Sequence, residues 1–151
     1  MAIGAESLMG ALNRGEKITI IMFNNTVYGT TGGQLAPTTL VEQVTGTTPK
    51  GRNPLREGFP VHTAELIATF KGVAYSARGA FNNPYNYERT RGYIKTAFKK
   101  QMDNIGLSFV EALSACPTNW HLSPEGSLKQ MEQKIIPEFP LGEFKNVDRI
   151  E

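Results

Sequence analysis

The chain has 151 residues, 40% of them hydrophobic, and a formal net charge of +2 from 16 basic and 14 acidic residues. This length suits a single domain over residues 1–151, and the balanced charge argues against nucleic acid or an anionic membrane as a partner. One cysteine excludes an internal disulfide framework. No apolar run is long enough to predict a transmembrane helix and the N-terminus lacks a secretion pattern, so we expect a cytoplasmic protein.

The hydrophobic pattern predicts helices that alternate with strands. In chain order, helices are expected over 5–13, 63–70, 84–102 and 124–136, and strands over 18–23, 73–77 and 107–115. Such alternation predicts an α/β fold with three layers, in which a parallel sheet is flanked by helices.

Details of these helices follow from capping and spacing. Ser123 is expected to cap the last helix, with Pro124 at its first position, and Thr63 is a candidate N-cap. On the long helix, the residues expected to face the core are Tyr87, Ile94, Ala97 and Phe98. A long loop over 34–58 is rich in Gly, Pro and Thr, with a short helical turn expected at 40–44.

The segment 24–34, with the sequence NNTVYGTTGGQ, follows the first predicted strand directly. Open α/β sheets bind ligands at the carboxyl ends of their strands, where this segment is expected to lie. An Asn carboxamide oxygen is a ligand that Mg²⁺ accepts, and glycines let the backbone approach a ligand closely. An ordinary turn is the alternative, since Asn and Gly also dominate turns.

The longer string NNTVYGTTGGQLAPTT resembles a loop of the thiamine-diphosphate-binding β subunit of 2-oxoacid:ferredoxin oxidoreductases. Three further blocks resemble that subunit in the same order: TTPKGR at 47–52, SACPTNWHLSP at 114–124 and PEFPLGEFK at 137–145. The resemblance covers residues 2–145 and is strongest to the 2-oxoglutarate and 2-oxoisovalerate branch. It implies the C-terminal portion of the thiamine-diphosphate-binding fold.

This resemblance implies a subunit of a hetero-oligomer that oxidatively decarboxylates a 2-oxoacid to acyl-CoA, with electrons passed to ferredoxin. In the family, the α subunit binds the aminopyrimidine ring and carries the activating Glu, and γ and δ subunits occur in some complexes. We therefore expect no catalytic residue in this chain. The sequence does not fix which 2-oxoacid is used. Thr30 replaces the family's usual Met or Leu, a change in the pocket wall whose effect on the substrate stays open.

The resemblance also implies roles for individual residues. The Asn25 side chain and the Val27 carbonyl are the expected Mg²⁺ ligands, and Tyr28, Gly29 and Thr31 are expected to line the diphosphate side of the cofactor pocket. Cys116 resembles one thiolate ligand of the family's [4Fe–4S] cluster. A lone cysteine is more often a buried and inert residue, which is the alternative for Cys116.

Two family features do not occur in the sequence. The Gly-Asp-Gly motif, whose Asp binds Mg²⁺, is absent, and so are the cysteines that complete a four-thiolate cluster. We therefore expect the C-terminal part of a β subunit, whether truncated, split or mis-started, with weak or no cofactor binding on its own. Two alternatives stay open: a non-catalytic remnant or assembly module, and a thiamine enzyme that does not use ferredoxin.

The long loop carries a basic group, and the chain has two histidines. Lys50 and Arg52 are weak candidates for a clamp on the carboxylates of a 2-oxoacid or on the phosphates of CoA, because Arg binds such groups bidentately. A solvated loop is the alternative. His62 and His121 are candidate bases, although a surface or structural role is favoured for both.

Overall fold

The computed structural model describes residues 3–150, and its centre is a four-stranded sheet in the order β1-β5-β4-β6. Strands β1 (Thr19–Asn24), β5 (Leu107–Leu113) and β4 (Val73–Ala80) are parallel, and β6 (Gly142–Asn146) pairs with β4 in the antiparallel direction. The predicted α/β fold with a mostly parallel sheet is confirmed. The antiparallel edge strand was not predicted.

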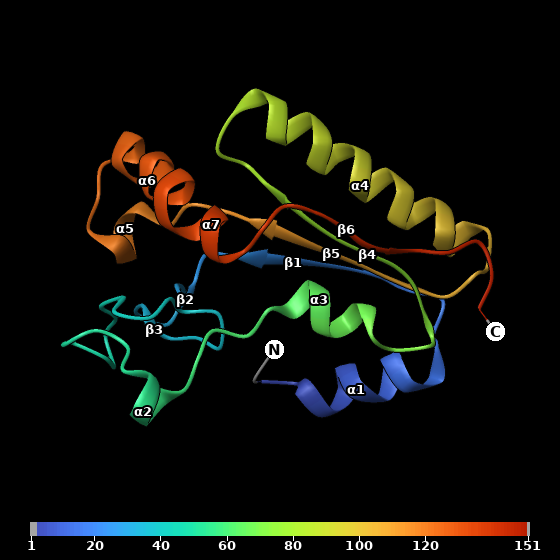
Figure 1. Ribbon diagram of the computed structural model, residues 1–151, viewed down its shortest axis with the longest axis horizontal. Coiled ribbons are helices and arrows are strands. Elements are labelled where there is room, and N and C mark those ends of the chain that lie inside the picture. The colour runs from blue at the N-terminus through green and yellow to red at the C-terminus, as the bar shows by residue number, and fades with distance from the viewer. Residues whose placement is uncertain (1–2, 151) are drawn as a thin grey trace.

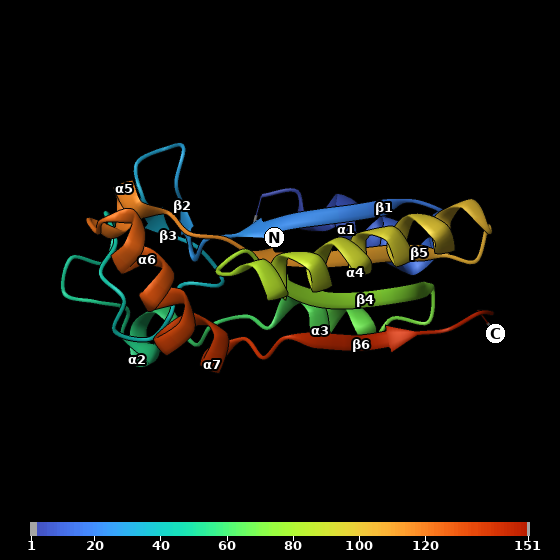
Figure 2. The same ribbon diagram turned by 90° about the horizontal axis from the view of Figure 1, so that it is seen from above.

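Helices cover both faces of the sheet (Figures 1 and 2). Helices α1 (Ala5–Arg14) and α3 (Thr63–Ala68) lie on one face, and α4 (Pro84–Met102) lies on the other. The first face has a core of buried apolar side chains: Leu12, Ala64, Ile67, Val73, Leu107 and Phe109. A smaller core lies under α4: Tyr75, Ala77, Ala97 and Val110. The predicted three layers are therefore present.

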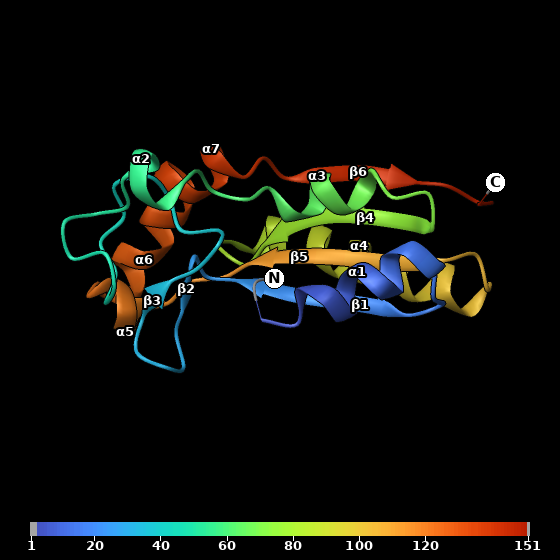
Figure 3. The same ribbon diagram turned by 90° about the horizontal axis from the view of Figure 1, so that it is seen from below.

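The shorter elements gather beyond the carboxyl ends of the parallel strands (Figure 3). A core of buried residues at this end of the sheet includes Leu113, Met131 and Phe139, and Trp120 packs against it. In chain order they are β2 (Val27–Tyr28), β3 (Gln34–Leu35), α2 (Pro54–Glu57), α5 (Pro117–Trp120), α6 (Pro124–Gln130), a π-helical turn (Met131–Ile135) and α7 (Ile136–Glu138). No helix within residues 3–150 is long and apolar enough to cross a membrane.

Several predicted details are confirmed and others are wrong. Ser123 caps α6, accepting a hydrogen bond from the Gly126 amide at 3.0 Å. Thr63 does not cap α3: it is the first helical residue, and its hydroxyl is buried without a hydrogen-bond partner. The segment 40–44 forms turns and no helix. The last predicted helix, 124–136, contains a π-helical turn at Met131–Ile135. This turn lies just before Pro137, which has no backbone N–H to donate to the helix.

The buried face of α4 is narrower than predicted. Ala97 is buried, but Tyr87 and Phe98 are 52% and 46% exposed. Ile94, also predicted to face the core, packs against the buried residues under the helix together with Tyr93. Near the start of the helix the approach to β4 is close, since a Cβ added at Gly79 would lie 2.1 Å from Thr90 Oγ1.

Candidate functional site

Asn24 is the last residue of β1 and its side chain is buried at the carboxyl edge of the sheet. Its Nδ2 donates to Oε1 of Glu111 at 2.6 Å. Its Oδ1 accepts hydrogen bonds from the Thr26 amide at 2.9 Å and from the Thr38 hydroxyl at 2.8 Å. Both lone pairs of the Asn24 carboxamide oxygen are therefore used inside the protein, which leaves Asn25 as the amide of the pair that can offer an oxygen to a ligand.

Asn25 is half-buried and lies in a tight turn between β1 and β2. Its Oδ1 accepts a hydrogen bond from the Val27 amide at 3.3 Å, so the side chain folds over the peptide that Val27 belongs to. The carbonyl of Asn25 accepts from the Trp120 indole at 3.2 Å. The structure thus brings Asn25 and Val27 together, and their role as metal ligands stays a prediction.

Two predicted site residues, Asn25 and Cys116, meet around a third, Gly29, in the turn between β2 and β3. A Cβ built on Gly29 would lie 3.3 Å from Asn25 Nδ2, 3.3 Å from Asn119 Nδ2 and 3.5 Å from Cys116 Sγ. Asn119 also donates to the Gly29 carbonyl at 3.1 Å. Segments that follow β1 and β5 therefore converge on one glycine-rich turn, and a side chain at position 29 would crowd the amides of Asn25 and Asn119.

This turn offers groups that suit a magnesium diphosphate. The Asn25 carboxamide and the Val27 carbonyl are oxygen ligands of the kind that Mg²⁺ prefers. The Tyr28 hydroxyl is buried without a hydrogen-bond partner, which marks an unused donor beside the turn. Thr31 is exposed, and its hydroxyl contacts Gln34 Oε1 at 2.8 Å. These groups are of the kinds that can bind Mg²⁺ and a diphosphate. All the oxygens that they offer are neutral.

Two cavities flank this region without including Asn25 or Val27 in their walls. One, of 520 Å³, lies between the 40–44 segment and the C-terminal helices, with Trp120 on its wall. The other, of 320 Å³, is lined by residues of the long loop that include Lys50 and Arg56. Since Trp120 donates to the Asn25 carbonyl, the larger cavity adjoins the predicted metal ligands through that indole ring.

An iron–sulfur cluster does not fit this chain. Cys116 is the single cysteine of the sequence, and four thiolates normally hold a [4Fe–4S] cluster. Its Sγ lies 3.2 Å from Nδ2 of Asn119, which donates to it. Among residues 3–150, no group of three or more His, Cys, Asp or Glu side chains is arranged to hold a metal ion.

Arg52 has a structural role in this conformation, which argues against the predicted substrate clamp. It is 5% exposed, and its guanidinium donates to five backbone carbonyls: Pro37, Thr39, Glu57, Gly58 and Phe59. Burial lowers the pKa of Arg52, and the charge of Glu57 opposes that effect. Because all its N–H groups are used, none is left for a carboxylate. Lys50 is exposed, and its predicted role is untested.

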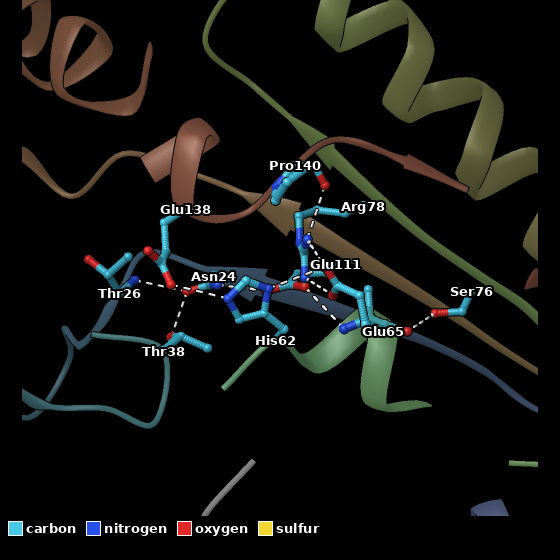
Figure 4. Close-up of polar contacts among 11 residues, drawn as sticks. Asn24, Thr26, Thr38, His62, Glu65, Ser76, Arg78, Glu111, Glu138 and Pro140 are labelled. Carbon is cyan, nitrogen blue, oxygen red and sulfur yellow. Dashed lines mark hydrogen bonds and ion pairs between the residues drawn. The ribbon is translucent and has the colours of Figure 1, made fainter. Parts of the chain in front are cut away.

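A buried ionic network lies behind the Asn24 side chain and was not predicted (Figure 4). Arg78 on β4 and Glu111 on β5 are register partners, and Nε of Arg78 donates to Oε2 of Glu111 at 2.8 Å. Arg78 also donates to both carboxylate oxygens of Glu65 and to the Pro140 carbonyl. The sequence signal was a charge inside each of two apolar strands, which becomes interpretable only when their register is known.

Electrostatics in this network favour the charged forms. Burial acts to lower the pKa of Arg78, but hydrogen bonds to Glu65 and Glu111 and their negative charges outweigh it, so this pKa lies above its usual value. Burial likewise acts to raise the pKa of Glu65, and the hydrogen bonds and charge of Arg78 bring it below its usual value. The rings of Phe139 and Phe144 lie 5.3 and 5.1 Å from the Arg78 guanidinium carbon.

The two histidines have different surroundings. His62 forms the outer end of the network, with its ring nitrogens 3.3 Å from Glu65 Oε1 and 3.1 Å from Glu138 Oε1 (Figure 4). His121 ends α5 in a left-handed conformation. His62 is thus engaged with carboxylates, which agrees with the structural role favoured for it.

Comparisons with known proteins agree with the fold and the motifs. Ketoisovalerate oxidoreductase subunit VorA of Methanothermobacter thermautotrophicus is 42% identical over 145 residues, which are 96% of this chain and 30% of that protein. 2-Oxoglutarate synthase subunit KorB of Archaeoglobus fulgidus is 35% identical over 135 residues, which are 89% of this chain and 46% of that protein. The chain therefore spans less than half of the length of either relative.

A solved structure shares the fold, and a family model matches the sequence. The structure is 2-oxoglutarate:ferredoxin oxidoreductase from Magnetococcus marinus with 2-oxoglutarate, coenzyme A and succinyl-CoA bound. It superposes with a TM-score of 0.65 at 20% identity, over 97% of this chain and 53% of that chain. Residues 1–112 match the model of the thiamine pyrophosphate enzyme C-terminal TPP-binding domain. The chain belongs to the family of thiamine pyrophosphate enzymes and contains their C-terminal TPP-binding domain.

Proposed function

We propose that this chain is the thiamine-diphosphate-binding part of a 2-oxoacid:ferredoxin oxidoreductase. The complex oxidatively decarboxylates a 2-oxoacid, forms the acyl-CoA and passes the electrons to ferredoxin. Support comes from relatives named for ketoisovalerate and 2-oxoglutarate, of which the ketoisovalerate enzyme is the more similar. A branched-chain 2-oxoacid is therefore the first substrate to test, and 2-oxoglutarate the second.

The role of this chain is to bind and orient the cofactor. The Asn25 carboxamide and the Val27 carbonyl hold Mg²⁺, while Tyr28, Gly29 and Thr31 line the diphosphate side. Thiamine diphosphate supplies the nucleophilic carbon and the electron sink when it is bound. A partner subunit supplies the group that activates the cofactor. A [4Fe–4S] cluster needs thiolates beyond Cys116, so no step is assigned to a cluster on this chain.

The observation that carries this proposal is the convergence around Gly29, where the turn containing Asn25 meets the segment containing Cys116. The same turn lies at the carboxyl edge of the parallel strands, where open α/β sheets bind ligands. The predicted ligands on this chain carry no negative charge. We therefore expect the isolated chain to bind Mg²⁺ and thiamine diphosphate weakly or not at all.

Calorimetric titration tests the cofactor, first on the isolated chain and then on the complex copurified with its partner subunits. The complex is expected to bind thiamine diphosphate and Mg²⁺, and Asn25→Ala is expected to abolish that binding. Asn13→Ala, an exposed amide on α1, is the matched control and should leave binding unchanged. Tight binding by the isolated chain would show that its neutral oxygens suffice.

Activity is then measured with CoA and a viologen dye on 2-oxoisovalerate, 2-oxoglutarate and pyruvate. Reduction of the dye that depends on both CoA and one 2-oxoacid supports the proposal and identifies the substrate. A complex that assembles but binds no cofactor overturns it in favour of an assembly module. Activity with a 2-oxoacid that needs neither CoA nor an electron acceptor indicates a thiamine enzyme of another kind.

A further inference from the structure

Thr26, between the two predicted metal ligands, has an unusual backbone. Its φ is 61°, in the left-handed region, although it is neither glycine nor Asn. For a β-branched residue this conformation is an outlier, and it costs about 1–2 kcal/mol. Strain of this kind persists only where the surroundings hold it, and it is concentrated at binding sites. The question is which residues hold Thr26.

Every polar atom of Thr26 has a partner, and the residue is completely buried. Its amide donates to Asn24 Oδ1 at 2.9 Å, and its carbonyl accepts from the Thr39 hydroxyl. Its own hydroxyl donates to the Asn25 carbonyl at 2.7 Å and accepts from Gln43 Nε2 at 2.8 Å. Among these partners, only Asn24 belongs to the central sheet.

The orientation of the Asn24 carboxamide is dictated by Glu111. A carboxylate only accepts hydrogen bonds, so the Asn24 group that lies 2.6 Å from Glu111 Oε1 must be the NH₂. The carboxamide oxygen then faces the amide of Thr26, which can only donate. Glu111 is fixed in turn by Nε of Arg78 at 2.8 Å. A flipped amide would place oxygen against carboxylate and NH₂ against N–H.

We propose that Asn24, oriented by the Arg78–Glu111 pair, is the positioning residue for the predicted Mg²⁺ ligands. Asn24 Oδ1 accepts a hydrogen bond from the Thr26 amide and so holds Thr26 in its left-handed conformation. This fixes the turn that carries both predicted ligands, Asn25 and Val27. This inference rests on the proposed function, because it assigns the turn to a metal. The inference goes beyond that function in one respect: the Arg78–Glu111 pair inside the sheet helps to position the metal ligands, through the Asn24 carboxamide.

A reciprocal exchange of groups tests this directly. Asn24→Asp places a carboxylate against Glu111, and Glu111→Gln removes the charge that faces Arg78. The double variant Asn24→Asp/Glu111→Gln restores a hydrogen bond in the reverse direction, from the Gln amide to the Asp carboxylate, and keeps the net charge. The new carboxylate at position 24 still offers an oxygen to the Thr26 amide. The single changes should therefore damage the turn, and the double change should repair it.

The first readout needs no cofactor and uses the full chain alone. Amide hydrogen exchange at Thr26 reports how often the turn opens. Each single variant is expected to accelerate this exchange by about tenfold or more, as a lost charge-assisted hydrogen bond implies. The double variant is expected to restore protection. Unchanged protection in both single variants overturns the inference and leaves the proposed function intact.

The second readout is the affinity for Mn²⁺, which electron paramagnetic resonance measures in the copurified complex with thiamine diphosphate. Loss of a residue behind the metal ligands typically weakens metal binding by about 10- to 100-fold, which is expected for each single variant and should be reversed in the double variant. If the single variants lose Thr26 protection but bind Mn²⁺ as tightly as the unchanged complex, the positioning role is overturned. An unchanged complex that binds no Mn²⁺ overturns the proposed function instead.

A second amide–carboxylate pair provides the matched control. Asn82 Nδ2 donates to Glu132 Oε1 at 3.0 Å, between the β4–α4 connection and the π-helical turn. The same exchange there, Asn82→Asp and Glu132→Gln, should alter neither Thr26 protection nor Mn²⁺ affinity. An equal response from this pair would mean that the effects report general loosening, which overturns the specific role of Asn24.

Discussion

Nε of Arg78 lies 2.8 Å from Oε2 of Glu111, and neither side chain is exposed to solvent. The two residues face each other on neighbouring parallel strands in the middle of the sheet. Removing two charges from water costs several kcal/mol per ion, so such a pair is tolerated only while every group has a partner. Glu65 and the Pro140 carbonyl accept three further hydrogen bonds from Arg78, and Asn24 donates to the other Glu111 oxygen.

Replacement of Arg78 should therefore be severe. Arg78→Met leaves the Glu111 carboxylate buried without its cation, and we expect the free energy of unfolding to fall by about 3–5 kcal/mol. Urea denaturation measures this. Arg78→Met/Glu111→Gln removes the unpaired charge and should recover part of the loss. A double variant no more stable than Arg78→Met would show that the buried charge is not the cause.

Acid should weaken the same network through Glu65. Its pKa lies below the usual value in the folded protein, so the folded state binds the proton less readily than the unfolded chain. The stabilisation is present above the usual carboxylate pKa and is lost as the pH falls through the lowered value. The melting temperature, followed from neutral pH into the acid range, should fall less steeply in Glu65→Gln.

Glu88→Gln is the control for this experiment. Glu88 pairs with Arg91 at 2.9 Å on the surface of α4, where both side chains are more than half exposed. Exposed pairs of this kind contribute little, so the acid profile should match that of the unchanged protein. If Glu88→Gln flattens the profile as much as Glu65→Gln does, general charge repulsion explains the acid effect.

The parallel sheet could be predicted because its strands are apolar runs separated by helical patterns. β6 could not be predicted in that way: its sequence GEFKN is polar and half exposed, and it joins the sheet through backbone pairing with β4. The loop around Asn25 was identified from residue types in a known string. Arg78, Glu111 and Asn24 were missed because the sequence does not show which polar side chains on neighbouring strands face each other. That becomes clear only when the register of the strands is known.

Arg52 and Lys50 can be separated by one pair of variants. Arg52→Lys removes the fork that reaches several backbone carbonyls at once, and we expect the free energy of unfolding to fall by about 3 kcal/mol. Lys50→Ala, on the exposed surface of the same loop, should leave stability unchanged. Thermal denaturation of both variants measures the difference.

The same two variants bear on substrate binding in the complex. If Arg52 holds the loop and no substrate, an assembled Arg52→Lys complex should keep its KM for the 2-oxoacid while it loses thermal stability. A large rise in KM at unchanged stability would restore the predicted clamp role for Arg52. A rise in KM for Lys50→Ala alone would assign that role to Lys50.

Gly33 links the glycine-rich turn to the segment that carries Cys116. Its φ is +74°, and an added Cβ would lie 2.7 Å from Asn119 Oδ1. Gly33→Ala therefore imposes backbone strain and displaces Asn119, and the free energy of unfolding should fall by about 1–2 kcal/mol. Because Asn119 Nδ2 lies 3.2 Å from Cys116 Sγ, its displacement should also uncover the sulfur, so the thiol should react faster with a disulfide reagent.

Gly92→Ala is the matched control for Gly33→Ala, because Gly92 lies within α4 with no atom near an added Cβ. Alanine is the better helix former, so this change should stabilise the protein by about 0.5–1 kcal/mol and leave thiol reactivity unchanged. Equal effects of the two substitutions would mean that the turn tolerates a side chain at position 33. The close packing of the turn against Asn119 would then not be what shapes the predicted diphosphate site.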